Sequence, residues 1–456
     1  MEWENLLKLD RLNDANYPEK KHRPPYVQDA DRILFSTPFR RLANKTQVHP
    51  LYENDHLHHR LIHSFEVACV GRSLGYEIGT WLADECKYIP NTKIEIIPGL
   101  VQAACMAHDI GNPPFGHSGE EAIASWFREK FSTPQGIFQD ISNTQRPEFE
   151  SFEGNAQGFR LLTRTEMYKN NGGMRLTLGS LGAFTKYPVS AFIKQKIDAG
   201  KNGDQPCYIG LKKYGVFEND IGTFQRVATE LGLLETPVED SNEQKIGSWW
   251  RRHPLAFLME AADDICYNIM DLEDAYLAGN ISFEEATTLL QGLITPPNKA
   301  YPDTTPVEII SRYRALAITG GIKACVQAFK DNYASIMNGT YQSALVDSSN
   351  KAEEFEKIKN IAAEKIFNAA RKTELEVYGR NVVYKTLDGI LPLLDELRDK
   401  NWNIDNISSY HSQLVRALNF PLSSINNSYD ALHCLTDFVS GMTDRYAVKV
   451  ANMISR

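Results

Sequence analysis

The chain has 456 residues, of which 42% are hydrophobic and 23% are charged, and its formal net charge is −9. A chain of this length can bury a large core in one domain or two, whereas its acidity disfavours a protein that mainly coats nucleic acid, because neutralising phosphates needs clustered lysine and arginine. It has no basic leader followed by an apolar run and no stretch of about eighteen apolar residues, so we expect a cytoplasmic protein that does not span a membrane. Seven scattered cysteines without a CxxC pair are typical of reduced thiols in that compartment.

Four basic islands interrupt the acidic chain, and each taken alone predicts solvated surface charge. They are HRPPY (22–26), FRRLANK (39–45), LKKYG (211–215) and WWRRH (249–253).

Apolar residues recur at helical spacing far more often than they alternate, which predicts a mainly α-helical protein. The first clear helix carries a buried stripe with His63 at its head, followed in steps of three and four by Val67, Val70, Leu74, Ile78 and Trp81. A second helix opens at Pro98, a favoured first-turn residue, and is stopped by Gly111 and the proline pair after it.

The sharp corner that follows is the segment AHDIGNPPFGHSGEEAI, residues 107–123. His108 and Asp109 are adjacent, so they share no helical face, but both can turn toward one cation where the helix ends. If a helix resumes after Gly116, His117 and Glu120 lie one turn apart, and the carboxylate can orient the imidazole.

The next segments predict fewer regular elements. Residues 132–152 are polar with two prolines and predict a long loop, and residues 172–210 predict a mixed segment with short strands. The four prolines of residues 295–306 predict a linker, so we expect a first region, 1–295, and a C-terminal helical region, 307–456, packed on it as one unit.

A long helix is predicted over Pro254–Leu277, where the apolar residues keep the helical period throughout. Asp263, Tyr267 and Asp271 are spaced by four, so they lie near one face of this helix. From the residues alone, either Asp263 or Asp264 can face inward.

Together with His63, His108 and Asp109, one of these aspartates completes a set of two imidazoles and two carboxylates. Such a mixed nitrogen and oxygen set suits Mn²⁺, Mg²⁺, Fe²⁺, Co²⁺ or Ni²⁺ with water in the open positions. Structural zinc would prefer thiolates, and the four groups of this set are imidazoles and carboxylates. The pattern therefore favours a hydrolytic metal site.

The motifs around these residues resemble, in order and across nearly the whole chain, the bacterial dGTPase family, the deoxyguanosinetriphosphate triphosphohydrolases of the HD superfamily. The resemblance implies an all-α, HD-domain helical fold with additional C-terminal helices and at most short strands, in which residues 1–295 form the metal-dependent phosphohydrolase core. It also implies a homo-oligomer, expected to be a hexamer. The motifs are RRLANKTQV (40–48), RLIHSFEV (60–67), HDIGNPPFGHSGEEA (108–122), FEGNAQGFRLL (152–162), TKYP (185–188), EAADDICYNIMDLEDA (260–275) and SGMTDRYA (440–447).

The resemblance also implies the role of each site residue. Asp263 is the expected ligand, because the family spaces the ligand, a tyrosine and a second aspartate by fours. His117 and Glu120 are implied as the catalytic pair, with the acid and base roles open. The other implied sets are the metal ligands His63, His108, Asp109 and Asp263; a further active-site residue, Asn155; phosphate-binding Arg60, Lys186 and Lys213, with Lys212 an alternative to Lys213; substrate-binding Tyr187; sugar-binding Gln47, Tyr267 and Asp271; and Arg445, which would support a nucleotide pocket from within or across a subunit interface.

The implied reaction is hydrolysis of a dNTP, dGTP first, at the α-phosphorus to a deoxynucleoside and inorganic triphosphate, which would adjust the dNTP pool. The expected cofactor is Mn²⁺ or Mg²⁺, with Co²⁺ or Ni²⁺ as alternatives. Two other hypotheses stay open: another HD-superfamily nucleotide phosphohydrolase, and a non-catalytic sensor of nucleotides or single-stranded DNA. Weak binding of single-stranded DNA is compatible with either.

Overall fold

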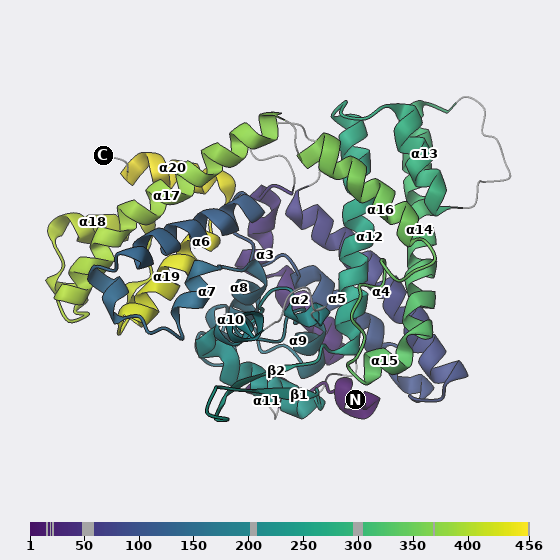
Figure 1. Ribbon diagram of the computed structural model, residues 1–456, viewed down its shortest axis with the longest axis horizontal. Coiled ribbons are helices and arrows are strands. Elements are labelled where there is room, and N and C mark those ends of the chain that lie inside the picture. Colours follow the sequence, from purple (N-terminus) through teal and green to yellow (C-terminus); the bar gives the residue numbers. More distant parts are fainter. Residues whose placement is uncertain are drawn as a thin grey trace.

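The computed structural model describes residues 1–14, 17–18, 20, 22–47, 59–200, 208–294, 304–367 and 370–454. Within these residues the protein consists of α-helices and a single two-stranded antiparallel sheet (Figure 1), which confirms the all-α fold with short strands. The first half contains α1 (Trp3–Leu6), α2 (Pro25–Leu34), α3 (Thr37–Arg41), α4 (Arg60–Thr80), α5 (Ile96–Ala107), α6 (His117–Ser132), α7 (Arg146–Glu150), α8 (Gly154–Arg160), α9 (Leu178–Phe184), α10 (Ala191–Ala199) and α11 (Ile221–Leu231). The second half contains β1 (Glu235–Glu239), β2 (Lys245–Trp250), α12 (Pro254–Leu277), α13 (Phe283–Leu293), α14 (Pro306–Asp331), α15 (Tyr333–Met337), α16 (Ala352–Ile361), α17 (Ala370–Asp399), α18 (Ser409–Leu418), α19 (Ser428–Ser440) and α20 (Asp444–Ile454).

Three helices, α4, α5 and α12, pack on one another (Figure 1). The stripe predicted on α4 is confirmed, since Val67, Leu74 and Ile78 are fully buried. Gly75 of α4 lies against the start of α5, where a Cβ atom would come within 2.7 Å of the Pro98 Cα atom. This close approach holds α4 against α5 near the ends of the two helices that are remote from His63 and His108.

The long helix α12 has the predicted bounds. It begins at Pro254, whose missing N–H costs nothing in the first turn. The preceding His253 caps it: its Nδ1 accepts a hydrogen bond from the Leu255 N–H at 3.0 Å, and its Nε2 donates to the Leu6 carbonyl at 3.0 Å. Both ring nitrogens are therefore satisfied in the neutral form, and burial lowers the pKa of this histidine to about 4.

Three local expectations are wrong. The helix expected to open at Pro98 starts two residues earlier, at Ile96. The loop expected over 132–152 contains a 3₁₀ helix, Gly136–Asp140, and α7, which uses Pro147 in its first turn. In the described part of 172–210 the chain forms α9 and α10 and no paired strand, because Thr177 and Ser190 cap these helices with their side chains. The strands lie farther along, in β1 and β2.

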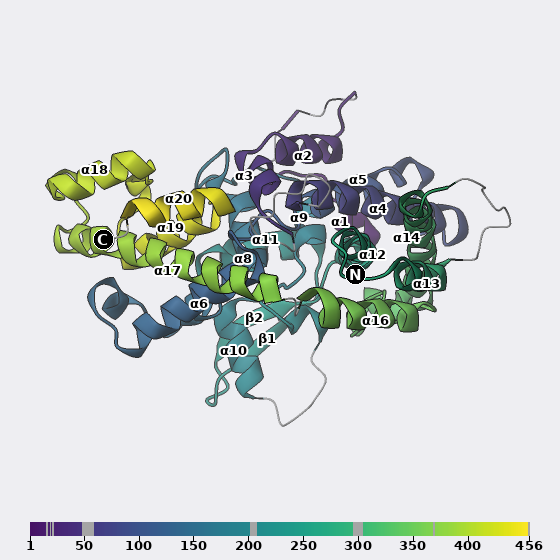
Figure 2. The same ribbon diagram turned by 90° about the horizontal axis from the view of Figure 1, so that it is seen from above.

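The region after residue 306 packs on the first region at two separate places, which Figures 1 and 2 show at opposite ends of the molecule. Helices α14 and α16 lie against α12 and α13, while α17 lies against α6, α19 and α20. The greater part of the predicted linker, residues 295–303, lies outside the described residues, and the division at this point stays a prediction. In the part of the chain that the structure describes, no helix has both the length and the apolar character that a bilayer crossing requires.

Replacing Gly75 by alanine should lower the free energy of unfolding by about 1–3 kcal/mol, because the added methyl group meets backbone atoms of α5 that cannot move alone. Gly222→Ala in α11 is the matched control, since among the described residues nothing lies within 4 Å of a Cβ there. This variant should leave stability unchanged or raise it by up to about 1 kcal/mol. Denaturant titrations of both proteins measure the difference, and equal stability would refute the close-packing argument.

Candidate active site

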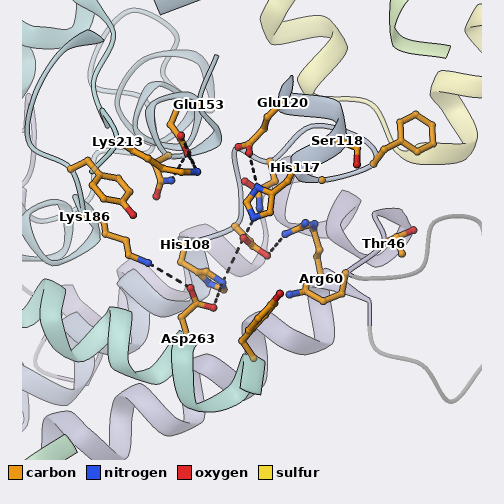
Figure 3. Close-up of a pocket in the computed structure, with 18 of the residues that line it drawn as sticks. Thr46, Arg60, His108, His117, Ser118, Glu120, Glu153, Lys186, Lys213 and Asp263 are labelled. Atoms are coloured by element: carbon orange, nitrogen blue, oxygen red, sulfur yellow. Dashed lines mark hydrogen bonds and ion pairs between the residues drawn. The ribbon is translucent and has the colours of Figure 1, made fainter. Parts of the chain in front are cut away.

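A cavity of about 540 Å³ opens between the corner after α5 and the facing sides of α4 and α12 (Figure 3). It is lined by most of the site residues expected from the sequence. These are Gln47, Arg60, His108, Asp109, His117, Glu120, Asn155, Lys186, Tyr187, Lys213, Asp263 and Tyr267.

The expected metal ligands meet at the base of this cavity. The ligand atoms of His63, His108 and Asp109 lie within 4.8 Å of one another. From α12, the Asp263 Oδ1 atom approaches Nε2 of His63 to 3.2 Å and Nε2 of His108 to 3.5 Å. Four candidate ligand groups from three places in the chain therefore lie close together.

Hydrogen bonds orient these groups for metal binding. Nδ1 of His108 lies 2.7 Å from the Cys105 carbonyl, which can only accept, so this nitrogen carries the proton. Nε2 of the same ring is buried, has no hydrogen-bond partner among the described residues, and therefore turns its lone pair toward the cluster. A histidine held in this way by a backbone carbonyl is the usual arrangement of a metal ligand.

Asp109 is held in the charged form that a metal ligand needs. Nη1 of Arg60 donates to its Oδ2 at 2.5 Å, and the Asn112 side-chain amide donates to its Oδ1 at 2.5 Å. Burial by itself raises the pKa of the Asp109 carboxyl, but the Arg60 guanidinium and the imidazoles of His108 and His63 together outweigh burial and lower the pKa to about 2. The donor set and its charges fit a divalent cation.

The two neighbouring aspartates of α12 differ in their surroundings. Burial opposes ionisation of Asp263, but the imidazoles of His108 and His63 and the Lys186 ammonium lower its pKa well below the ordinary value. Burial and the nearby Glu260 carboxylate raise the pKa of Asp264 to about 7. Asp263 is therefore the anion that faces the two histidines.

His117 and Glu120 form the pair expected from their spacing. Helix α6 starts at His117, and Nδ1 of His117 lies 2.7 Å from Oε2 of Glu120 (Figure 3). The other Glu120 oxygen accepts from the Gly154 N–H at 2.8 Å, so the carboxylate is buried and held at both ends. Its hydrogen bond and charge raise the pKa of His117, whose ring is exposed to the cavity.

The cations of the cavity come from separate segments. Lys186 Nζ lies 3.8 Å from Asp263 Oδ2, and Lys213 Nζ lies 3.0 Å from Glu153 Oε2. Lys213 lines the cavity and the adjacent Lys212 does not, which favours Lys213 among the two alternatives left by the sequence.

Three expected residues do not line the cavity. His63 is buried in the first turn of α4. Asp271 is buried in α12, one turn beyond Tyr267. Arg445 is exposed on α20, because its neighbour Asp444 occupies the inward position. A role for Arg445 across a subunit interface stays a prediction.

Asp444 and Lys45 are structural supports that the sequence did not single out. Asp444 accepts hydrogen bonds from the Thr46 N–H at 3.1 Å and the Phe115 N–H at 3.0 Å. Lys45 donates to the carbonyls of Asn112 at 2.6 Å and Ser440 at 2.7 Å. Lys45 belongs to a basic island that was expected on the surface, yet both residues are buried because two distant segments close over them.

Glu153 is another cavity residue that sequence analysis missed. It accepts from the Asn155 side-chain amide at 2.7 Å and pairs with Lys213, so it orients two of the expected site residues. Its position two residues before Asn155 in the FEGN segment was the available signal.

The chain resembles known proteins along its whole length. The family model of the HD domain matches residues 60–170, which contain three of the four clustered ligand groups. A deoxyguanosinetriphosphate triphosphohydrolase-like protein of Synechocystis sp. is 36% identical over 456 residues, covering 98% of this chain and 97% of the relative. One of Pseudomonas aeruginosa is 36% identical over 472 residues, covering 99% and 98%. A deoxyguanosinetriphosphate triphosphohydrolase of Klebsiella pneumoniae is 28% identical over 520 residues, covering 97% and 98%.

Replacing the α12 aspartates one at a time tests the ligand assignment. Asp263→Asn should weaken Mn²⁺ binding by about a hundredfold or more, because a neutral amide replaces an anionic ligand. Asp264→Asn, the matched control on the next residue, should change it by less than about fivefold, since burial already disfavours its charge. Calorimetric titration with Mn²⁺ measures both, and the reverse order would make Asp264 the ligand.

Proposed function

Because this chain belongs to the deoxyguanosinetriphosphate triphosphohydrolase-like family of HD-domain, metal-dependent phosphohydrolases, we propose that it hydrolyses dGTP at the α-phosphorus to deoxyguanosine and inorganic triphosphate. One observation carries the proposal: a two-histidine, two-carboxylate cluster lies at the base of the same cavity that a histidine–glutamate pair and two lysines line. Hydrolysis of a phosphate ester needs all three, since it requires an activated water, a proton-transfer group and cations for the phosphoryl oxygens.

His63, His108, Asp109 and Asp263 would hold the divalent metal, for which we propose Mn²⁺ or Mg²⁺, with Co²⁺ or Ni²⁺ as alternatives. When bound, the metal would polarise the α-phosphate and lower the pKa of a coordinated water.

His117 is the proton-transfer group of the proposal. Its Nδ1 is engaged by Glu120, so only Nε2 can exchange a proton with the reactants. The neutral ring can accept a proton from water at Nε2, and the cationic ring can donate one to the departing 5′ oxygen. Glu120 favours the cationic ring, and Asn155 lines the same cavity.

Arg60, Lys186 and Lys213 would balance the triphosphate charge, which an acidic protein can bind only by concentrating cations locally. At the sugar end, Gln47 can bond the 3′ hydroxyl, and the Tyr267 ring can crowd a 2′ hydroxyl, which would discriminate against ribonucleotides. Tyr187 lines the same cavity. Asp271, one turn behind Tyr267, would act on the sugar only through that ring. The homo-hexamer, the cytoplasmic location and the weak binding of single-stranded DNA stay predictions.

The reaction products test the proposed function. With dGTP and Mn²⁺ the protein should release inorganic triphosphate, and His117→Ala should lower the rate by about 10²- to 10⁴-fold while Mn²⁺ affinity is retained, as expected for a lost proton-transfer group. Ser118→Ala, a change on the next cavity residue, is the control. Release of orthophosphate or pyrophosphate would indicate another HD phosphohydrolase. Salt-sensitive DNA binding without turnover would indicate a sensor.

The pH dependence of kcat tests the pairing of His117 with Glu120. Glu120→Gln removes the carboxylate that raises the pKa of His117, so this pKa should fall. If the reaction needs the cationic ring, kcat falls as pH rises through the pKa of His117. If it needs the neutral ring, kcat rises over the same range. In either case the part of the pH profile that His117 controls should move to lower pH in Glu120→Gln. A limb that stays in place or moves to higher pH would show that His117 does not control it.

A further inference from the structure

Arg252 is the most completely buried large cation near the cavity, although its island, WWRRH, predicted surface charge. Its side chain has 0% exposure, and it lies two residues before α12. It does not line the cavity, so it cannot touch the substrate directly.

The guanidinium of Arg252 joins three separate segments. Nε donates to the Lys186 carbonyl at 2.6 Å, Nη1 donates to Glu260 Oε2 at 2.7 Å, and Nη2 donates to the Ile209 carbonyl at 3.3 Å. Only arginine presents donors in a rigid planar fork that can serve acceptors in three directions at once.

Two of these segments carry the cavity lysines. The first bond holds the backbone of Lys186 itself. The bond from Nη2 holds Ile209, whose carbonyl also accepts from the Lys212 N–H at 3.2 Å, in the short turn that leads into Lys213. The backbone N–H of Arg252 donates to the Tyr208 hydroxyl at 3.0 Å, which secures the same turn.

Glu260, the third partner, faces Lys186 from α12. Its Oε1 atom lies 3.5 Å from Lys186 Nζ, and Lys186 Nζ lies 3.8 Å from Asp263 Oδ2 (Figure 3 shows this second pair). Neither separation is a hydrogen bond, so the two carboxylates hold the ammonium by charge alone and leave its donors available.

We infer that Arg252 is a positioning residue that sets the two cavity lysines at the spacing a substrate polyphosphate requires, and that Glu260 is the anion that substrate phosphate displaces from Lys186. This inference rests on the proposed function, because it takes phosphate as the ligand of Lys186 and Lys213. It explains why a buried arginine is kept beside a buried lysine, an arrangement that costs stability unless both are compensated.

The test compares Arg252→Lys with Arg251→Lys, the same change one residue earlier. Arg251 lies over the Trp249 ring at 4.2 Å and outside the cavity. Arg252→Lys should raise KM for dGTP and the dissociation constant of inorganic triphosphate by about ten- to a hundredfold, the worth of one misplaced charge-assisted hydrogen bond. Its Mn²⁺ affinity should change by less than about threefold, because no metal ligand is touched, and Arg251→Lys should behave as wild type.

Glu260→Gln is the second variant, and it decides the matter if Arg252→Lys does not fold. The amide keeps an oxygen for Arg252 and removes the competing charge, so triphosphate should bind several-fold more tightly. The assignment is overturned if both variants bind triphosphate more weakly, or if both also lose Mn²⁺ affinity. Either result would show that Arg252 and Glu260 only stabilise the fold.

Lys186→Ala separates failure of this inference from failure of the proposed phosphate role. If Lys186→Ala weakens triphosphate binding and Arg252→Lys does not, only the positioning role is refuted. If Lys186→Ala does not change triphosphate binding, the proposed role of Lys186 in binding phosphate is refuted as well. The identity of the reaction products is tested independently of either result.

Discussion

Compensation of buried charge where α4, α5 and α12 meet is the constraint on which the rest of the structure depends. Asp263 and Asp109 are carboxylates in an interior that disfavours ions, and each is kept ionised by neighbouring imidazoles and by a cation, Lys186 or Arg60. Removing one partner from such a set leaves an uncompensated buried charge. This destabilises the fold far more than replacing both partners with apolar residues would. The charges of the cluster therefore stay compensated only while α4, α5 and α12 are packed together.

Close helix packing meets this requirement. Gly75 lets α4 approach the first turn of α5, and Gly111 lets the corner after α5 approach α8, where a Cβ would come within 2.2 Å of the Gly154 carbonyl oxygen and the Gly158 nitrogen. Because these contacts involve backbone atoms, larger side chains cannot be accommodated by rotation of a neighbour. The small residues of the corner thus position His108 and Asp109 as much as they end a helix.

The C-terminal helices complete the site although they contribute no residue to the metal cluster. Lys45 and Asp444 connect the ends of α19 and α20 to the corner that carries Asp109, and Arg252 joins the loops that carry the cavity lysines. The groups that would contact substrate are thus held by buried polar residues that do not contact it. For a phosphohydrolase this arrangement has a clear use, since transition-state stabilisation depends on donors that are already in position before reaction.

Local sequence was sufficient for the long helices α4 and α12 and for most residues of the candidate site, but it misplaced the start of α5, the short helices within 132–152 and the strands. Helical periodicity predicted α4 and α12, the spacing of His117 and Glu120 predicted their hydrogen bond, and the order of the motifs predicted which residues would share a cavity. These features depend on residues within a turn or two of one another, or on whole motifs. The sequence could not separate Lys212 from Lys213, it assigned Lys45 and Arg252 to the surface, and it did not indicate that Asp444 is buried. Their burial depends on segments that are far apart in the sequence; Lys45 and its acceptor Ser440, for example, are separated by 395 positions. A charged side chain has the same local pattern whether it meets water or a carbonyl from another helix, so only the tertiary structure decides which of the two it meets.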